Sequence, residues 1–280
     1  MSHQHHATLN GTEVSDVRIP LVGLGTWPLT GADCTKAVSQ ALESGYRHID
    51  TAQNYANEDA VGQAIRESGL GRDEVFLTTK FNKESHGGES AVRQAAERAL
   101  DRMGLDHLDL FLVHWPNPDQ GLYVETCNSL AELVGTGLIR AWGVSNFKPG
   151  HLHKILSAGL VPPINQVQVD PLHAQRDHER ANTEAGVVTA AYSPLGRGGE
   201  LLQSAELSEP AERLGRTPAQ IALRWHVQQN RIVLPRSANT DRQRQNLDVF
   251  DFELTKADME RIDSMDTGKG ARLDADTFGH

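Results

Sequence analysis

Leu108-Asp109-Leu110-Phe111-Leu112-Val113-His114 is an apolar run that ends in a histidine. Similar runs, each ending in a side chain able to carry chemistry, recur at 46–50, 75–80, 141–146, 164–170, 187–192 and 232–236. Stretches long enough for a helix separate most of them, which indicates a repeat of strand, loop and helix. In a closed parallel barrel the carboxyl ends of all strands meet at one mouth, so the residues that end these runs become neighbours. The pattern therefore predicts an enzyme.

The fold class predicted from this repeat is α/β, a (β/α)₈ TIM barrel with an N-terminal β-hairpin and extra C-terminal helices. One barrel core needs about 250 residues, and the chain has 280. We therefore expect a single domain over 1–280, with residues 1–8 as a flexible terminus. Turn-forming Asn10-Gly11 predicts a hairpin within 7–20 on the barrel floor, before a first strand at 21–25. Helices are expected near 33–44, 57–68, 89–103, 122–135, 148–158 and 174–185, from 217, from 240 and at 256–265.

Composition and charge limit the partners of the chain. The formal net charge of -10 argues against non-specific nucleic-acid binding. No apolar stretch approaches the ~20 residues of a membrane helix, and the first residues lack the apolar core of a signal peptide. Cys34 and Cys127 are the only cysteines and lack metal-ligand spacing, so reduced thiols and no metal are expected. We expect a cytoplasmic protein, monomeric, that binds a small molecule and neither nucleic acid nor membrane.

Lys80 follows the apolar run 75–79, so its stem should be buried and its ammonium held near the barrel axis. A buried, unpaired ammonium is costly, and Asp50, at the end of an earlier strand, is the obvious partner. An interior ion pair without chemistry is the alternative interpretation of these two residues. Perturbed charges of this kind also gather at functional sites.

Tyr55 lies in the loop after the strand that ends at Asp50, where its hydroxyl can turn back toward the mouth. A phenol has a pKa near ~10, which is too high for easy proton donation at neutral pH. An adjacent ammonium should lower that pKa and make Tyr55 a general acid. His114 could then hydrogen-bond a carbonyl oxygen, although a lone histidine there is more often a core residue.

These groups suit proton delivery to an oxygen that becomes negative when hydride adds to a carbonyl. None of them supplies hydride, so a nicotinamide cofactor is implied. The first strand is followed by no Gly-x-Gly-x-x-Gly loop, but 235–242 carries two arginines, intervening hydroxyls and a helix start near Thr240. Two forked guanidiniums suit a terminal phosphate. Solvated surface arginines are the alternative interpretation.

The order and spacing of several motifs resemble the aldo-keto reductases, over roughly 21–265. The first motif is GYRHIDTA at 45–52 with YANE at 55–58, and the later ones are LVHWP at 112–116, GVSNF at 143–147 and YSPLG at 192–196. The resemblance implies a TIM barrel that binds NADP(H), as NADPH or NADP+, in an extended pose and reduces aldehyde and ketone carbonyls to alcohols. Within this family the chain is similar to the bacterial members, such as the 2,5-diketo-D-gluconate reductases.

Residue roles implied by the resemblance follow the matched motif positions. Tyr55 would be the proton donor, with Lys80 and Asp50 as its tuning pair and His114 as the residue that orients the carbonyl. The substrate would contact Trp27, Asn54, Tyr55, His114 and Trp115. The cofactor would contact Gly25, Thr26, Trp27, Asp50, Ser145, Asn146, Gln166, Tyr192, Ser193, Leu195, Arg236, Ser237, Arg242, Gln245 and Asn246. Of these, Arg236, Ser237 and Arg242 would hold the adenosine 2′-phosphate, and Gln245 and Asn246 would lie near the adenine.

Some positions depart from the commonest family pattern. Gln168 and Asp170 stand where Glu and Asn or His are usual, and Arg236 replaces a usual Lys. The segment 116–121 is short, and the chain extends little beyond Phe278, so an open site and a modest C-terminal lid are expected. Two rival functions are a barrel aldolase that forms a Schiff base on Lys80 and a nucleotide-binding, channel-associated subunit.

Overall fold

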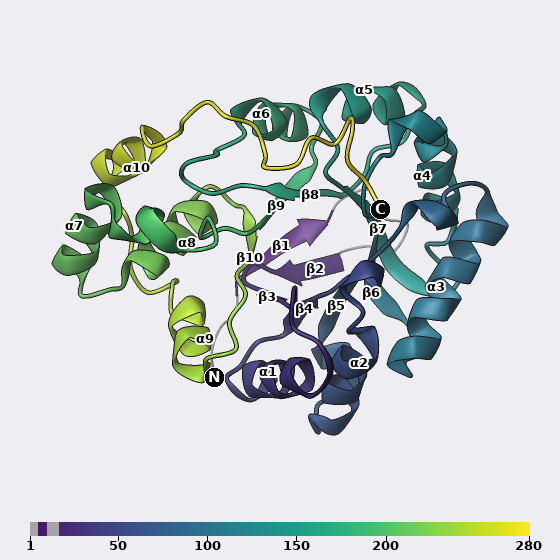
Figure 1. The fold of residues 1–280 in the computed structure, drawn as a ribbon, viewed down its shortest axis with the longest axis horizontal. Helices are drawn as coiled ribbons and strands as arrows, with labels where there is room; N and C mark the ends of the chain where they lie inside the picture. The colour runs from purple at the N-terminus through teal and green to yellow at the C-terminus, as the bar shows by residue number, and fades with distance from the viewer. Residues whose placement is uncertain (1–4, 10–16) are drawn as a thin grey trace.

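Eight parallel strands form the centre of the molecule (Figure 1). The computed structural model describes residues 5–9 and 17–280. Each strand pairs in parallel with the next along the chain, and a parallel bridge between Val22 and Val233 joins the last strand to the segment leading into the first. The predicted (β/α)₈ barrel is therefore confirmed. Its strands are β3 (Leu24–Gly25), β4 (His48–Asp50), β5 (Phe76–Phe81), β6 (Leu108–Val113), β7 (Ile139–Ser145), β8 (Ile164–Gln168), β9 (Val188–Tyr192) and β10 (Ile232–Leu234).

Helices surround the barrel as Figure 1 shows, and most lie within a few residues of their predicted positions. The α-helices are α1 (Gly31–Glu43), α2 (Glu58–Glu67), α3 (Glu89–Met103), α4 (Tyr123–Glu132), α5 (Pro149–Ser157), α6 (Arg176–Glu184), α7 (Ala205–Leu214), α8 (Pro218–Gln228), α9 (Thr240–Leu247) and α10 (Lys256–Asp263). The 3₁₀ helices are η1 (Gln53–Tyr55), η2 (Arg72–Glu74), η3 (Lys83–Ser85), η4 (Pro118–Gln120) and η5 (Gly199–Gln203). Helix α7 was not predicted from the sequence.

An antiparallel hairpin of β1 (His6–Leu9) and β2 (Val17–Pro20) closes the floor of the barrel. Pro20 ends β2, and its carbonyl oxygen lies 3.3 Å from Nδ1 of His48, the residue that begins β4. Residues 6–8 belong to β1, and Leu9 and Ile19 of the hairpin are buried in the core. The predicted Asn10-Gly11 turn lies outside the described residues.

Most residues of the barrel strands are buried, as expected of parallel strands with helices on one face and the barrel interior on the other. Every residue of β5 and β6 is buried, including the charged Lys80 and Asp109. The carboxyl ends of these strands open at the end of the barrel opposite the hairpin. The polar side chains that end the apolar runs of the sequence are therefore presented at this mouth.

The segment 266–280 follows α10 and runs back across the mouth (yellow in Figure 1). Thr267 N donates to Leu172 O at 3.1 Å, and Arg272 N donates to Gln168 Oε1 at 3.1 Å. Farther along, Lys148 Nζ pairs with Asp276 at 2.6 Å and also with Asp274. This segment, called the tail below, is thus fastened to several barrel loops.

Candidate active site

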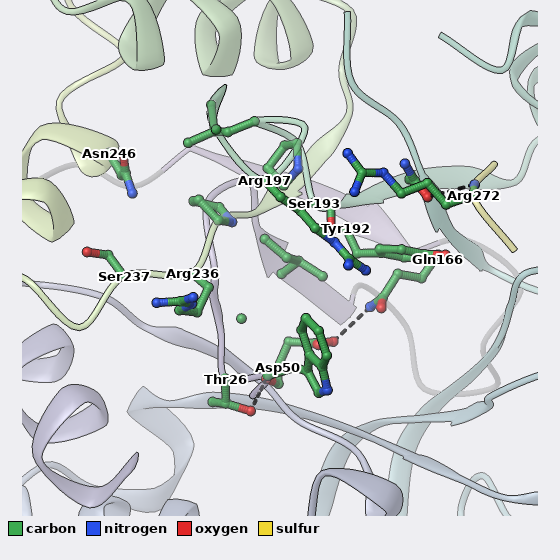
Figure 2. A pocket seen from close by; sticks show the side chains of 18 of the residues that line it. Thr26, Asp50, Gln166, Tyr192, Ser193, Arg197, Arg236, Ser237, Asn246 and Arg272 are labelled. Carbon is green, nitrogen blue, oxygen red and sulfur yellow. Dashed lines mark hydrogen bonds between the residues drawn. The ribbon is translucent and has the colours of Figure 1, made fainter. Parts of the chain in front are cut away.

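A cavity of about 1380 Å³ opens at the carboxyl ends of the strands. Figure 2 shows side chains from strands, loops and α9 that line it. Of the site residues predicted from the sequence, only Lys80 is absent from the lining, because it lies buried behind Asp50. The predicted residues that line it are Gly25, Thr26, Trp27, Asp50, Asn54, Tyr55, His114, Trp115, Ser145, Asn146, Gln166, Tyr192, Ser193, Leu195, Arg236, Ser237, Arg242, Gln245 and Asn246.

Asp50 is the junction of the buried polar groups. Lys80 Nζ donates to Asp50 Oδ1 at 2.7 Å and to the carbonyl oxygen of Thr51 at 2.8 Å. The other carboxylate oxygen, Oδ2, accepts from Gln166 Nε2 at 2.7 Å, the contact drawn as a dashed line in Figure 2. Burial lowers the pKa of Lys80 and the nearby Asp50 carboxylate opposes that shift. The predicted ion pair is confirmed, and it reaches one residue farther, to Gln166.

Tyr55 ends η1 and is half-buried at the cavity wall. Lys80 Nζ lies 5.3 Å from the centroid of its ring, and the His114 ring lies edge-on at 5.9 Å. Burial, with a smaller contribution from Asp50, raises the pKa of Tyr55 above its usual value. The expectation that Lys80 lowers this pKa is therefore wrong. The Lys80 charge is matched by Asp50 at 2.7 Å, so desolvation of the phenolate dominates.

His114 follows β6 directly and is held as a neutral imidazole. Burial lowers its pKa well below the usual value, and the Lys80 ammonium and His280 act in the same direction. Its Nδ1 is buried without a hydrogen-bond partner among the described residues. A neutral imidazole retains one N–H donor, so His114 is suited to hydrogen-bond an oxygen in the cavity.

A second polar network lies beside Asp50. Asn146 Nδ2 donates to His114 O at 3.0 Å and to Ser145 Oγ at 3.1 Å, while Ser145 Oγ donates to Gln166 O at 2.8 Å. The Tyr192 hydroxyl donates to Asn146 Oδ1 at 2.9 Å. These bonds fix the wall between the ends of β7, β8 and β9. Among residues 5–9 and 17–280 no group donates to Gln166 Oε1, so this oxygen can accept from a ligand.

The far end of the cavity is cationic. Arg236 and Arg242 are exposed, and within the described part of the chain neither guanidinium takes part in an ion pair. They flank the N-terminus of α9, where Asn239 Oδ1 accepts from Arg242 N at 2.9 Å. Helix N-termini and unpaired guanidiniums both favour anions. The two arginines are therefore better interpreted as a site for a phosphate group than as a solvated surface pair.

Several lining residues were not predicted from the sequence. Arg197, in a left-handed backbone conformation, stacks its guanidinium 5.0 Å from the centroid of the Trp27 ring. The tail adds Arg272, Phe278 and His280. No periodic pattern marks these loop residues, although the arginines could have been considered as anion ligands.

The unusual residues Gln168 and Asp170 organise the loop after β8. Gln168 Oε1 accepts from the backbone of Arg272, whose guanidinium in turn donates to Gly196 O at 3.0 Å. The buried Asp170 carboxylate accepts from Leu172 N at 3.0 Å and lies 3.0 Å from His173 Nδ1. The departure from the family pattern thus lies in the anchoring of the tail and leaves Asp50, Tyr55, Lys80 and His114 unaffected.

Sequence and structure comparisons agree with this geometry. The sequence model of the Aldo/keto reductase family matches residues 21–267. The chain belongs to the aldo/keto reductase family. It is 45% identical to an aldo-keto reductase of Mycobacterium sp. (strain KMS) over 262 residues, which is 93% of this chain and 94% of that protein. It is 40% identical to methylglyoxal reductase DkgA of Yersinia pestis over 264 residues, 93% of this chain and 94% of that one.

A crystal structure of a Gox0644 mutant in complex with NADPH superposes on this aldo/keto reductase with a TM-score of 0.91. The two chains are 36% identical, and the match covers 98% of each. Family membership makes the chain an oxidoreductase. This argues against the rival interpretation of the chain as a barrel aldolase. In the described residues no group of His, Cys, Asp or Glu is arranged to hold a metal ion, and no helix is long and apolar enough to cross a membrane.

Proposed function

We propose that this aldo/keto reductase reduces aldehyde and ketone carbonyls to alcohols with NADPH, with Tyr55 as the proton donor. The observation that carries the proposal is the continuous set Tyr55, Lys80, Asp50 and Gln166. It runs from a phenol at the cavity wall, through a buried ion pair, to an amide that faces the same cavity. The Gln166 amide is hydrogen-bonded to the Asp50 carboxylate, and the Tyr55 ring lies beside the ammonium with which this carboxylate pairs.

The lining of the cavity offers groups for each part of NADPH. Arg236, Ser237 and Arg242 offer unpaired cations and a hydroxyl for the 2′-phosphate, and Gln245 and Asn246 lie beside them for the adenine. When bound, NADPH supplies the hydride for the carbonyl carbon. Toward the catalytic end, backbone and side chains for the remainder of the cofactor come from Gly25, Thr26, Trp27, Asp50, Ser145, Asn146, Gln166, Tyr192, Ser193 and Leu195.

The Gln166 side chain can bind a carboxamide only as a hydrogen-bond acceptor. Its Nε2 is committed to Asp50 at 2.7 Å, and its backbone oxygen accepts from Ser145 Oγ. The side-chain oxygen is therefore the atom left to accept from an amide N–H. Asp50 thus orients Gln166 as well as pairing with Lys80.

Proton transfer follows from the environments of Tyr55 and His114. Burial raises the pKa of Tyr55, so the phenol stays protonated at neutral pH, and its proton would pass to the more basic oxygen that becomes negative as hydride adds to the carbonyl. His114, neutral and hydrogen-bonding through an N–H, orients the carbonyl oxygen toward the phenol. The Lys80 ammonium lies 5.3 Å from the centroid of the Tyr55 ring, over its face, and holds the ring in place by a cation–π contact. The remaining substrate wall comprises Trp27, Asn54 and Trp115.

A substrate screen with NADPH tests this function. NADPH oxidation would be followed with methylglyoxal, keto sugar acids and aromatic aldehydes, the first of which is the substrate named for the relative from Yersinia pestis. Turnover of at least one class supports the proposal, and NADPH binding without any turnover contradicts it. A Schiff base on Lys80 is disfavoured because its nitrogen is buried and is held by Asp50 Oδ1 and by the carbonyl oxygen of Thr51.

Two further parts of the proposal concern the cellular compartment and the oligomeric state of the enzyme. Cys34 and Cys127 are both free and buried, which suits a reducing compartment such as the cytoplasm. We also propose that the enzyme is a monomer. Size-exclusion chromatography with light scattering tests the second point.

A further inference from the structure

The tail delivers two rings to the catalytic end of the cavity. Phe278 packs edge-on against Trp115, with ring centroids 4.9 Å apart. His280 lies 5.6 Å from His114, 6.2 Å from Trp115 and 5.0 Å from Phe278, centroid to centroid. Both residues line the cavity. A second imidazole therefore faces the place proposed for the reacting carbonyl.

The position of His280 is fixed through its main chain. Its backbone oxygen accepts from Lys83 N at 2.5 Å and from Asn117 Nδ2 at 3.4 Å. A Cβ atom on Gly279 would collide with Asn117, so the tail fits closely here. The ion pairs of Lys148 with Asp274 and Asp276, and the contact of His151 Nε2 with Asp276 Oδ1 at 3.0 Å, hold the preceding residues.

The imidazole of His280, in contrast, is not engaged. Within the described part of the chain, the contacts of its ring are the aromatic ones to His114, Trp115 and Phe278. The ring is partly exposed, and it borders the cavity. The main chain of His280 is held and its ring borders the cavity, so the imidazole is available to a ligand bound there.

We propose that His280 is a specificity-determining residue that hydrogen-bonds a second oxygen on the carbon next to the reacting carbonyl. The inference rests on the proposed function. With His114 holding the reacting oxygen, His280 lies on the same side of the cavity, one ring-to-ring distance of 5.6 Å away. Oxygens on adjacent carbons are separated by less than this, so each ring can reach one of them. The substrate class so selected is the α-dicarbonyls and α-hydroxycarbonyls.

The apolar neighbours strengthen this assignment. Trp115 and Phe278 flank His280, so the space around the second oxygen is mainly aromatic. An oxygen placed there without a hydrogen bond would be desolvated at a cost, and His280 is the tail side chain positioned to satisfy it. A substrate without that oxygen gains nothing from the imidazole.

The test compares methylglyoxal with propanal, which has the same number of carbons but lacks the second oxygen. His280→Phe should lower kcat/KM for methylglyoxal about tenfold, the size of one neutral hydrogen bond, and change that for propanal by less than about twofold. His280→Gln, which retains a donor, should keep most of the methylglyoxal activity. His153→Phe, at an exposed position on α5, is the matched control.

Every other outcome of this comparison contradicts the role proposed for His280. An equal loss for both substrates in His280→Phe, or a loss in His280→Gln as large as in His280→Phe, overturns the hydrogen-bonding role and leaves His280 as part of the wall. No loss in His280→Phe also overturns it. If the unaltered enzyme reduces propanal but not methylglyoxal, only this inference fails; if it reduces no carbonyl while binding NADPH, the proposed function fails as well.

Discussion

Gln166 Nε2 donates to Asp50 Oδ2 at 2.7 Å, so the amide proposed to hold the nicotinamide is tied to the carboxylate that neutralises Lys80. The two sides of the proposed reaction, hydride delivery and proton delivery, therefore share one buried anchor. A substitution at Gln166 should therefore affect Asp50, and a substitution at Asp50 should affect Gln166.

Gln166→Ala should weaken NADPH binding and lower kcat together, because it removes the cofactor contact and leaves Asp50 Oδ2 without its partner. The loss of a hydrogen bond to a charged group corresponds to about 1.5–3 kcal/mol. Fluorescence titration with NADPH and steady-state kinetics measure the two effects. Asn128→Ala, on the exposed face of α4, is the control. A change in NADPH affinity with kcat unaltered would show that the anchor is not shared.

Asp50→Asn should lower the free energy of unfolding, because it leaves the Lys80 ammonium buried without a counter-charge. Removing one partner of a buried pair costs about 3–5 kcal/mol. In the double variant Asp50→Asn with Lys80→Met, the loss should be smaller than the sum of the two single losses. Urea denaturation measures all three. Additive losses would mean that the pair does not interact.

Arg242→Ala and Arg236→Ala should each weaken NADPH binding by about tenfold or more and leave NADH binding nearly unchanged, because only NADPH carries the 2′-phosphate. Arg244→Ala is a matched control on the same helix, since its guanidinium is exposed and lies 3.8 Å from Asp241. Equal losses for both cofactors would remove the proposed 2′-phosphate contact.

His48 should make the stability of the fold depend on pH. Burial lowers its pKa from 6.5 to about 4 in the folded state. Between these values the unfolded chain binds the extra proton, so stability contributed by neutral His48 is full above pH 6.5 and is lost as pH falls toward 4. The slope from this one group is about 1.4 kcal/mol per pH unit.

His48→Gln should flatten the pH dependence of stability by that amount, while His153→Gln, at an exposed position, should not. Urea midpoints measured from pH 7 down to pH 4.5 supply the comparison. Parallel curves for His48→Gln and the unaltered protein would show that the folded-state pKa of His48 is not depressed.

The barrel and much of the site were predictable from the sequence because polar residues stand at the ends of apolar strands. Lys80, placed after 75–79, could be paired with Asp50 from chemistry alone, and the structure has them 2.7 Å apart. The motif resemblance supplied most of the cavity lining. Both kinds of signal are local in sequence, and the barrel topology converts them into proximity.

Other features depend on the folded environment. The direction of the Tyr55 pKa shift follows from burial, which the sequence does not reveal. Helix α7 was missed because Pro210 lies inside it, a residue that ordinarily ends a helix. The tail residues Arg272, Phe278 and His280 follow the last helix without periodicity, so nothing in their order predicted that they would enter the cavity.

Tyr55→Phe tests the central claim most directly, since it removes the hydroxyl and keeps the ring beside Lys80. The measurement is the rate of NADPH oxidation with a reducible aldehyde, alongside the dissociation constant of NADPH for the same variant. The account predicts a fall in kcat of at least about a hundredfold with NADPH affinity nearly intact. Full carbonyl reduction by Tyr55→Phe would contradict it.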